Sequence, residues 1–183
     1  RLIKTRISQL KRELEQVKRH RELLREGRKK DNLLTGAIVG YTNAGKSTLL
    51  NTLTHAGVLE EDKLFATLDP TTRVLELPGK QKIYLTDTVG FIRKLPHHLI
   101  EAFKSTLEEA KYADVIIHVV DASNPQMDQQ MYVVYETLKE LGVKDKKVVT
   151  LFNKQDKISK EEIFRDFQAD YVLKISARTG QGL

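Results

Sequence analysis

The chain has 183 residues, of which 40% are hydrophobic, so it can bury a core and is not a disordered polymer. It contains no cysteine, which excludes disulfides, thiolate metal sites and a cysteine nucleophile. Its longest apolar run, at residues 115–120, is interrupted by His118 and is far shorter than a membrane span. Because the sequence starts at Arg1 and stops at Leu183 just after a Gly-rich turn, we expect a longer parent protein.

The net charge of +6 is unevenly distributed along the chain. Residues 1–30 contain 12 Lys or Arg and 4 Glu, a net charge of +8. The remaining 19 basic and 21 acidic residues give residues 31–183 a net charge of −2. Such asymmetry is typical of a segment that meets a polyanion, either a nucleic acid or a membrane surface.

The same basic segment has a helical hydrophobic pattern, with apolar residues at alternating four- and three-residue steps. The positions are Ile3, Ile7, Leu10, Leu14, Val17 and Leu24. The pattern predicts a coiled-coil-type helix with one apolar seam, which a missing upstream helix or a second copy would cover. A solvated linker helix and a basic arm near RNA both fit, whereas a membrane-surface helix would carry Trp or Phe on its apolar face.

Predicted strands and helices alternate after residue 32, which indicates an α/β domain with a mostly parallel sheet. Alternating residues around Pro78-Gly79 predict a hairpin that adds one antiparallel strand. Ser159 and Glu162 form a capping-box pattern that predicts a helix ending at Phe167. The expected strands are 33–39, 73–77, 82–86, 114–120, 147–152 and 171–175; the other expected helices are 46–53, 99–110 and 128–141; residues 55–72 are expected to form a long loop.

A phosphate-binding motif, G-x-x-x-x-G-K-[ST], lies between the first predicted strand and its helix. It comprises Gly40, Tyr41, Thr42, Asn43, Ala44, Gly45, Lys46 and Ser47, and Thr48 completes the predicted phosphate contacts. The glycines let backbone amides point at a phosphate, and the helix start adds its positive dipole end. Lys46 supplies charge for the outer phosphates, and the Ser47 hydroxyl is the expected Mg²⁺ ligand. The motif predicts nucleoside triphosphate binding without specifying the base.

An N-K-x-D motif after the buried strand at 147–152 indicates which base is recognised. It comprises Asn153, Lys154 and Asp156. The carboxylate can accept two hydrogen bonds from guanine, which adenine does not offer, and the Lys154 stem can lie along the base. Ser176, Ala177 and Arg178 follow the last predicted strand and fit a loop that places a backbone N–H near the guanine carbonyl.

A D-x-x-G motif, formed by Asp87, Thr88, Val89 and Gly90, is placed to sense the third phosphate. Asp87 would hold Mg²⁺ through a water, and the Gly90 N–H would bond the terminal phosphate, so the segment would rearrange when that phosphate leaves. A second side-chain ligand for Mg²⁺ could come from Thr67, Thr71 or Thr72, and spacing alone does not choose among them.

Together these motifs resemble the Era- and Obg-like, translation-factor-related P-loop GTPases, and among them the HflX family of ribosome-associated GTPases. The family-specific stretches are Gly40–Ser47, Phe65–Thr71, Asp87–Ile92 and the His-Val-Val-Asp-Ala-Ser run at 118–123. The resemblance implies a three-layer GTPase domain over residues 32–183, truncated at its C-terminal end. It also implies that the basic helical linker over residues 1–31 is the second arm of a helical hairpin.

The resemblance also implies residue roles. Phe65, Ala66, Thr67, Leu68 and Asp69 would form switch I and Asp87–Gly90 switch II. The family pattern favours Thr67 as the remaining Mg²⁺ ligand. Where many related GTPases place a water-orienting Gln, this chain has Phe91, so no catalytic side chain is assigned. Asn43 makes a K⁺ site possible, and an Asn that only shapes the loop is the alternative.

The expected function is a Mg²⁺-dependent GTP-binding and GTP-hydrolysing switch, slow alone and stimulated by the ribosome. Its expected partners are GTP or GDP and the large ribosomal subunit with its RNA, and it would split or rescue stalled or idle ribosomes. We expect a monomer without a membrane span, located in the cytoplasm or, in a eukaryote, in an organelle. The alternative is a nucleotide-gated RNA- or ribosome-binding scaffold with incidental turnover, whereas Asn153 and Asp156 disfavour an ATPase.

Overall fold

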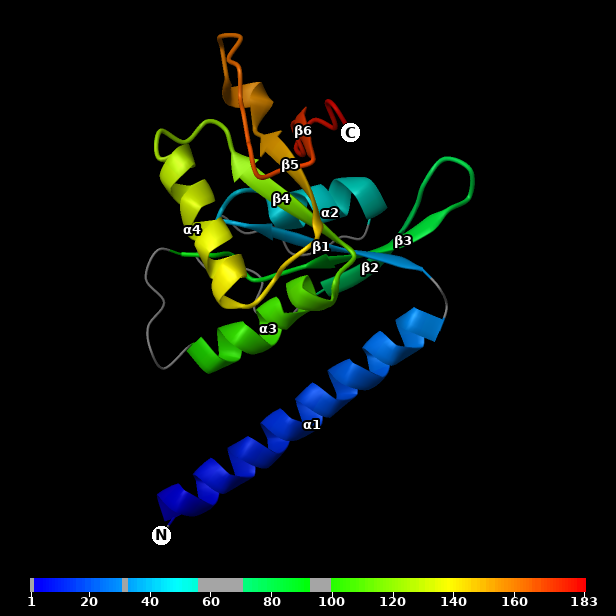
Figure 1. Ribbon diagram of the computed structural model, residues 1–183, viewed down its shortest axis with the longest axis vertical. Helices are drawn as coiled ribbons and strands as arrows, with labels where there is room; N and C mark the ends of the chain where they lie inside the picture. Colours follow the sequence, from blue (N-terminus) through cyan, green and yellow to red (C-terminus); the bar gives the residue numbers. More distant parts are fainter. Residues whose placement is uncertain (1, 31–32, 56–70, 93–99) are drawn as a thin grey trace. The chain divides into compact units, whose positions relative to one another are not determined.

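The computed structural model describes residues 2–30, 33–55, 71–92 and 100–183 (Figure 1). The chain divides into two units, Arg1–Leu33 and Leu34–Leu183, and each is described by itself. The first unit is one helix, α1 (Leu2–Lys30), as the heptad-like pattern predicts. The seam residues are exposed, from 38% at Leu14 to 76% at Ile3. No helix among the described residues is both long and apolar enough to cross a membrane.

The second unit is built on a six-stranded sheet with the order β2-β3-β1-β4-β5-β6. All neighbouring strands are parallel except β2 and β3, which form the predicted antiparallel hairpin. The strands are β1 (Leu34–Gly40), β2 (Thr71–Glu76), β3 (Lys82–Asp87), β4 (Val115–Asp121), β5 (Lys147–Asn153) and β6 (Tyr171–Lys174). The predicted α/β class, with a mostly parallel sheet and one antiparallel strand, is confirmed. Thr71 and Thr72, placed by the sequence in a loop, begin β2.

Helices cover both faces of the sheet and make three layers. The helices are α2 (Lys46–Thr54), α3 (Ile100–Tyr112) and α4 (Met127–Glu140). Successive residues of β1 face opposite layers, as strand geometry requires. Ala37 and Val39 pack in one core cluster with residues of α3 and α4, whereas Ile38 packs in another with Leu49 and Leu50 of α2. Both faces of β1 are therefore buried, which explains its continuous apolar sequence.

The predicted helix from Ser159 to Phe167 is wrong, because this stretch contains no helix. Only a single 3-10 turn, η2 (Gln155–Lys157), precedes it. The Phe164 ring stacks on Phe152 of β5 at 4.9 Å between ring centroids, and Asp166 accepts a hydrogen bond from Thr150 of the same strand. These tertiary contacts hold the chain in a non-helical path and override the local capping signal.

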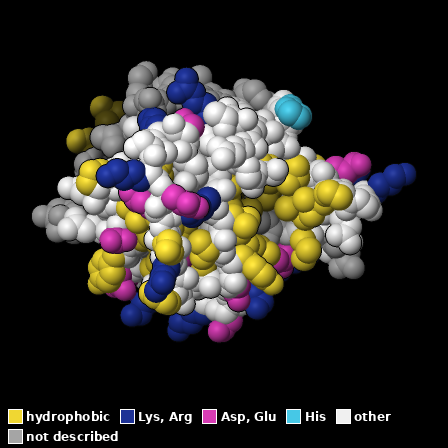
Figure 2. Space-filling view, turned by 90° about the horizontal axis from the view of Figure 1, so that it is seen from above, with side chains coloured by type: hydrophobic (Ala, Val, Ile, Leu, Met, Phe, Trp, Pro, Cys, Tyr) yellow, Lys and Arg dark blue, Asp and Glu magenta, His cyan; other side chains and the backbone are white. Residues whose placement is uncertain are grey.

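Hydrophobic side chains remain exposed near the C-terminal end of the second unit. Ile163 is 81% exposed, Phe167 91% and Tyr171 66%. Figure 2 shows hydrophobic side chains interspersed with charged ones on the face seen from above. The edge strand β6 is exposed along its whole length, so its core contacts are made by the residues that follow it, Ile175 and Ala177.

Candidate functional site

The predicted motifs within the described residues meet at the carboxyl edge of the parallel strands. The phosphate loop joins β1 to α2, Asp87 ends β3, Asn153 ends β5, and Ser176 follows β6. Ligands of open α/β sheets bind in the crevice outside this edge. The stretch Phe65–Asp69, with the predicted ligand Thr67, lies outside the described residues.

The phosphate loop is shaped by glycines at places where a side chain could not fit. A Cβ on Gly40 would overlap the carbonyl oxygen of Val119 in β4. Gly45 has a φ of +97°, which favours glycine, and a Cβ there would overlap the amide nitrogen of Asn153. Gly45 is also the N-cap of α2, so the first turn of that helix follows the phosphate loop directly, with its positive dipole end at the loop.

Lys46 is a buried ammonium in the phosphate loop. The residue is only 7% exposed, and its Nζ donates a hydrogen bond to the carbonyl of Tyr41 at 3.2 Å. Burial lowers the pKa of Lys46 from 10.5 to about 8, against the opposing effect of Asp87. The ammonium is therefore still charged at neutral pH but poorly solvated, and an anion beside it would relieve that cost.

Two oxygen ligands of the kind that Mg²⁺ prefers meet beside the phosphate loop. The Ser47 hydroxyl donates to Asp87 Oδ2 at 2.7 Å, and Asp87 is fully buried. A buried carboxylate next to a hydroxyl fits a hard divalent cation that also binds phosphates. Of the other threonines considered, Thr71 lies opposite Asp87 in the sheet register, and Thr72 shares a hydrogen bond with Thr86 at 2.8 Å.

The Asp87–Gly90 segment is held against β1 by hydrogen bonds of Thr88 and lies close to the phosphate loop at Gly90. Thr88 Oγ1 donates to the Ile38 carbonyl at 2.7 Å. A Cβ on Gly90 would lie 2.7 Å from Thr42 Cα and 3.2 Å from Lys46 Nζ, so only glycine allows this approach. The Gly90 backbone therefore lies where a phosphate held by Lys46 would be within reach.

Phe91 joins the phosphate loop through its backbone and the core through its ring. Its N–H donates to the Gly40 carbonyl at 3.0 Å, and its carbonyl accepts from Thr42 N–H at 2.8 Å. The ring is 1% exposed and packs in the core cluster that includes Phe103 and Leu107 of α3. The side chain at the usual water-orienting position thus points away from the crevice.

Asn153 links the phosphate loop to the loop after β6. Its Nδ2 donates to the Ala44 carbonyl at 2.9 Å, and its Oδ1 accepts from the Ala177 N–H at 2.8 Å. The residue is 2% exposed, so both bonds are shielded from water. One buried amide therefore sets the distance between the phosphate-binding and base-binding motifs.

Lys154 and Asp156 are also placed by specific contacts. Lys154 Nζ donates to the Asn43 carbonyl at 2.8 Å, across the exposed rim of the phosphate loop. The Ser176 hydroxyl donates to Asp156 Oδ1 at 2.6 Å, and this bond is the main reason why the pKa of Asp156 is lowered. Asp156 is exposed and stays ionised, so it keeps its capacity to accept hydrogen bonds. The charge of the exposed Arg178 also helps to lower the pKa of Asp156.

Sequence reasoning missed two residues that position the base side. Asp121 at the end of β4 accepts a hydrogen bond from Lys154 Nζ at 2.7 Å. It also accepts hydrogen bonds from the N–H and the hydroxyl of Ser123. Thr52 of α2 donates to the Ala177 carbonyl at 2.6 Å. Asp121 could have been found, since it is an acidic residue at a strand end that pairs in register with Asn153. Thr52 carries no such signal.

Comparison with known proteins places this geometry in a family. Residues 35–154 match the family described as 50S ribosome-binding GTPase. The protein named GTPase HflX from Lacrimispora saccharolytica is 70% identical over 183 residues, which is 100% of this chain and 43% of that protein. The chain thus spans less than half of this curated relative.

Two solved structures are similar in fold. The crystal structure of the SsGBP–GDP complex has a TM-score of 0.72 and 33% identity, covering 97% of this chain and 55% of that one. A GTP-binding protein from the hyperthermophilic archaeon Sulfolobus solfataricus in complex with GDP has a TM-score of 0.66 and 32% identity, covering 88% and 52%. The chain belongs to the family of 50S ribosome-binding GTPases and, within it, to the HflX proteins.

Proposed function

We propose that the chain is a Mg²⁺-dependent switch that binds GTP and hydrolyses it to GDP and phosphate. The observation that carries the proposal is the buried Asn153 side chain, which bonds the phosphate loop and the Ser176–Arg178 loop at once. A ligand that fills both loops has phosphates at one end and a base at the other. The GDP complexes of the structural relatives support the same ligand class.

At the phosphate end, the buried charge of Lys46 and the amides of the 40–48 loop would bind the outer phosphates. Ser47 and Asp87, with Thr67 as the proposed third side chain, would hold Mg²⁺, Asp87 through a water. Bound there, Mg²⁺ neutralises charge on the phosphate oxygens. The Gly90 amide would bond the terminal phosphate, so the Asp87–Gly90 segment would respond to its loss.

At the base end, the ionised Asp156 would accept two hydrogen bonds from guanine. The Lys154 stem would lie along the base, because its ammonium is already bonded to the Asn43 carbonyl of the phosphate loop. The backbone of Ser176, Ala177 and Arg178 would face the guanine carbonyl. Calorimetry with GDP, GTP and ATP tests this proposal, since equal heats for GTP and ATP, or none with GTP, would refute it.

We propose that hydrolysis is slow in the isolated chain, because the Phe91 ring is buried and offers no group to orient water. The large ribosomal subunit would supply the missing stimulation. Asn43 is exposed, so its side-chain oxygen could bind K⁺ and add positive charge near the phosphates. Turnover measured with and without large subunits, and in KCl against NaCl, tests the two ideas separately.

The proposed partner is the large ribosomal subunit with its RNA, and the proposed role is the splitting or rescue of stalled or idle ribosomes in the cytoplasm by a monomer. The net charge of +8 on residues 1–30 supports an RNA partner, because phosphates attract such a segment strongly at moderate salt. Co-sedimentation with large subunits should be stronger with a non-hydrolysable GTP analogue than with GDP. Equal pelleting with both nucleotides would contradict a switch.

A nucleotide-gated ribosome-binding scaffold is a second candidate, favoured by the same buried Phe91 ring. It would share every binding contact but would not need turnover. Single-turnover hydrolysis on ribosomes separates the candidates, because a switch is accelerated by large subunits and a scaffold is not.

A further inference from the structure

The segment from Ile158 to Asp170 joins the two loops proposed to read the base. It follows η2, which contains Asp156, and it leads into β6 and Ser176. No described residue of this segment is helical, so its backbone is not braced by the regular hydrogen bonds of a helix. The two loops are also bonded directly, by Ser176 to Asp156 and by the Gln155 N–H to the Ile175 carbonyl at 3.1 Å, so the contacts that hold the segment against the sheet add to these bonds in setting the separation of the loops.

Asp166 is one of two polar anchors of this segment, since Asp170 also accepts hydrogen bonds from Lys147 Nζ at 3.1 Å and from the Val148 N–H at 2.9 Å in β5. Asp166 Oδ2 accepts hydrogen bonds from Tyr135 of α4 and Thr150 of β5, each at 2.6 Å. Its Oδ1 accepts from the Gln168 N–H at 3.0 Å, and its side chain is 3% exposed. Burial of a carboxylate costs free energy unless its oxygens accept hydrogen bonds, so the buried Asp166 side chain needs these partners.

A buried histidine completes the surroundings of Asp166. His118 Nδ1 of β4 lies 4.0 Å from Asp166 Oδ2, and its ring meets the Tyr135 ring edge-on at 5.1 Å. Burial lowers the pKa of His118 to about 4, so the imidazole is neutral at neutral pH. The Asp166 carboxyl group is therefore bonded by two hydroxyl groups and the Gln168 N–H, with a neutral imidazole beside it.

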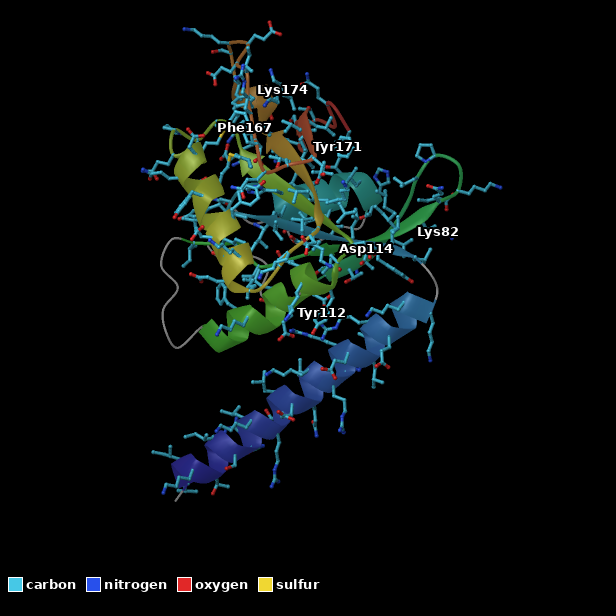
Figure 3. All side chains as sticks on the ribbon, viewed as in Figure 1. Lys82, Tyr112, Asp114, Phe167, Tyr171 and Lys174 are labelled. Carbon is cyan, nitrogen blue, oxygen red and sulfur yellow. The ribbon has the colours of Figure 1, made fainter. Side chains whose placement is uncertain are left out.

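A second contact of the same segment reaches the residue beside Asn153. Phe164 stacks on Phe152, whose carbonyl accepts from the Gln155 side chain and from the Ile175 N–H, each at 3.0 Å. Lys174 of β6 lies over the Phe164 ring at 5.5 Å and donates to the Glu162 carbonyl. Lys174 and Phe167 mark this region in Figure 3. The segment, β5 and β6 thus form one packed unit beneath both base-reading loops.

We infer that Asp166 is a positioning residue for guanine recognition, because its bonds to Tyr135 and Thr150 hold the 158–170 segment against the sheet and so fix Asp156 relative to Ser176. This inference rests on the proposed function and adds a residue that would not touch the nucleotide. Asp166 lies midway in the sequence between the two loops, so its release would free the middle of the segment that joins them. The phosphate loop has its own bonds and would keep its shape.

The test compares the affinities for GDP and IDP in the 183-residue chain, because IDP lacks the exocyclic amine that Asp156 is proposed to read. The variants are Asp166→Ala and Tyr135→Phe, which removes one hydroxyl and keeps the ring. Glu161→Gln, exposed on the same segment, is the matched control. A partly unfolded sample lowers the active fraction but leaves the ratio of the two dissociation constants unchanged, so the ratio reports positioning.

We expect Asp166→Ala to reduce the preference for GDP over IDP by about fivefold or more, and Tyr135→Phe by about twofold. Glu161→Gln should leave the preference as in the parent. An unchanged preference in both Asp166→Ala and Tyr135→Phe would overturn the inference, even if both proteins melted earlier. A parent chain that did not distinguish GDP from IDP would instead overturn the guanine site itself, and this inference with it.

Discussion

The backbone determines the shape of the crevice on the side proposed to bind phosphates, whereas side chains determine its shape on the side proposed to bind the base. Gly40, Gly45 and Gly90 each lie where a Cβ would meet another residue, and Phe91 bonds the phosphate loop through its main chain. The loops proposed to read the base instead depend on the side chains of Asn153 and Lys154. Added bulk should therefore damage the first half, and the loss of polar groups should damage the second.

Removal of the link between the two halves should have the largest effect. Asn153→Ala would leave the Ala44 carbonyl and the Ala177 N–H buried without their partner. We expect a loss of about 4 kcal/mol in the free energy of unfolding and a marked loss of GDP affinity. Urea unfolding and calorimetry measure the two effects. Asn124→Ala, which removes only the bond to the Gln126 N–H at 2.8 Å, is the control and should cost far less.

Added bulk on the phosphate side should come next. Gly40→Ala would press a methyl group against the Val119 carbonyl, which cannot move without opening the sheet. We expect a destabilisation of about 3 kcal/mol by urea unfolding. Gly36→Ala in the same strand is a matched control, because its new methyl group would meet the flexible Leu85 side chain at 3.0 Å. An equal loss of stability in both variants would contradict the claim that close backbone contacts determine the shape of this half.

The buried His118 should make stability depend on pH. Its folded pKa of about 4 lies below the usual 6.5, so the unfolded chain binds more protons between these values. Stability contributed by the neutral imidazole is present above pH 6.5 and is lost as the pH falls toward 4, by about 2 to 3 kcal/mol.

The groups that face this imidazole are Asp166 from the 158–170 segment, Tyr135 from α4 and the charge of Lys46 from α2. His118→Gln should flatten the profile of unfolding free energy between pH 6.5 and 4 relative to the parent. Parallel profiles for the two proteins would show that the imidazole does not titrate as its burial requires.

The smallest expected effect concerns the partner of Lys154. Asp121 and Lys154 form an ion pair at 2.7 Å, with side chains 14% and 20% exposed. Asp121→Asn keeps the shape but removes the charge, and we expect a loss of about 1 kcal/mol in stability. Nucleotide affinity should fall modestly, and the loss should shrink as salt is raised, because screening already weakens the pair in the parent. Asp128→Asn in the first turn of α4 is the charge-matched control.

Much of the fold could be predicted from the sequence, because its strands and helices show their own periods. The buried strands are continuous apolar runs, and the hairpin carries Pro78-Gly79 between two alternating stretches. The helix expected over Ser159–Phe167 failed for a physical reason, since Asp166 and Phe164 gain more from the sheet than from a local helix. A local pattern cannot report a partner that lies elsewhere in the chain.

The candidate site was predictable as motifs but not as contacts. Phosphate binding requires residues of the types of Gly40, Gly45 and Lys46 at this spacing, so the phosphate loop can be recognised in the sequence. By contrast, the two hydrogen bonds of the Asn153 side chain and the ion pair between Asp121 and Lys154 form only when the ends of different strands meet. Thr67 remains a prediction from family resemblance, because it lies outside the described residues.

The backbone attachment of Phe91 limits how the preceding segment can move. Thr88 is tied to Ile38 at one end, and Phe91 is tied to Gly40 and Thr42 at the other. A rearrangement that moves Gly90 can therefore follow one of two routes. The backbone can rotate between Thr88 and Phe91 with the bonds at both ends intact, or both main-chain bonds of Phe91 can break so that the segment separates from the phosphate loop by peeling. The two routes differ in hydrogen exchange, because only peeling would expose the Phe91 amide to solvent deuterium.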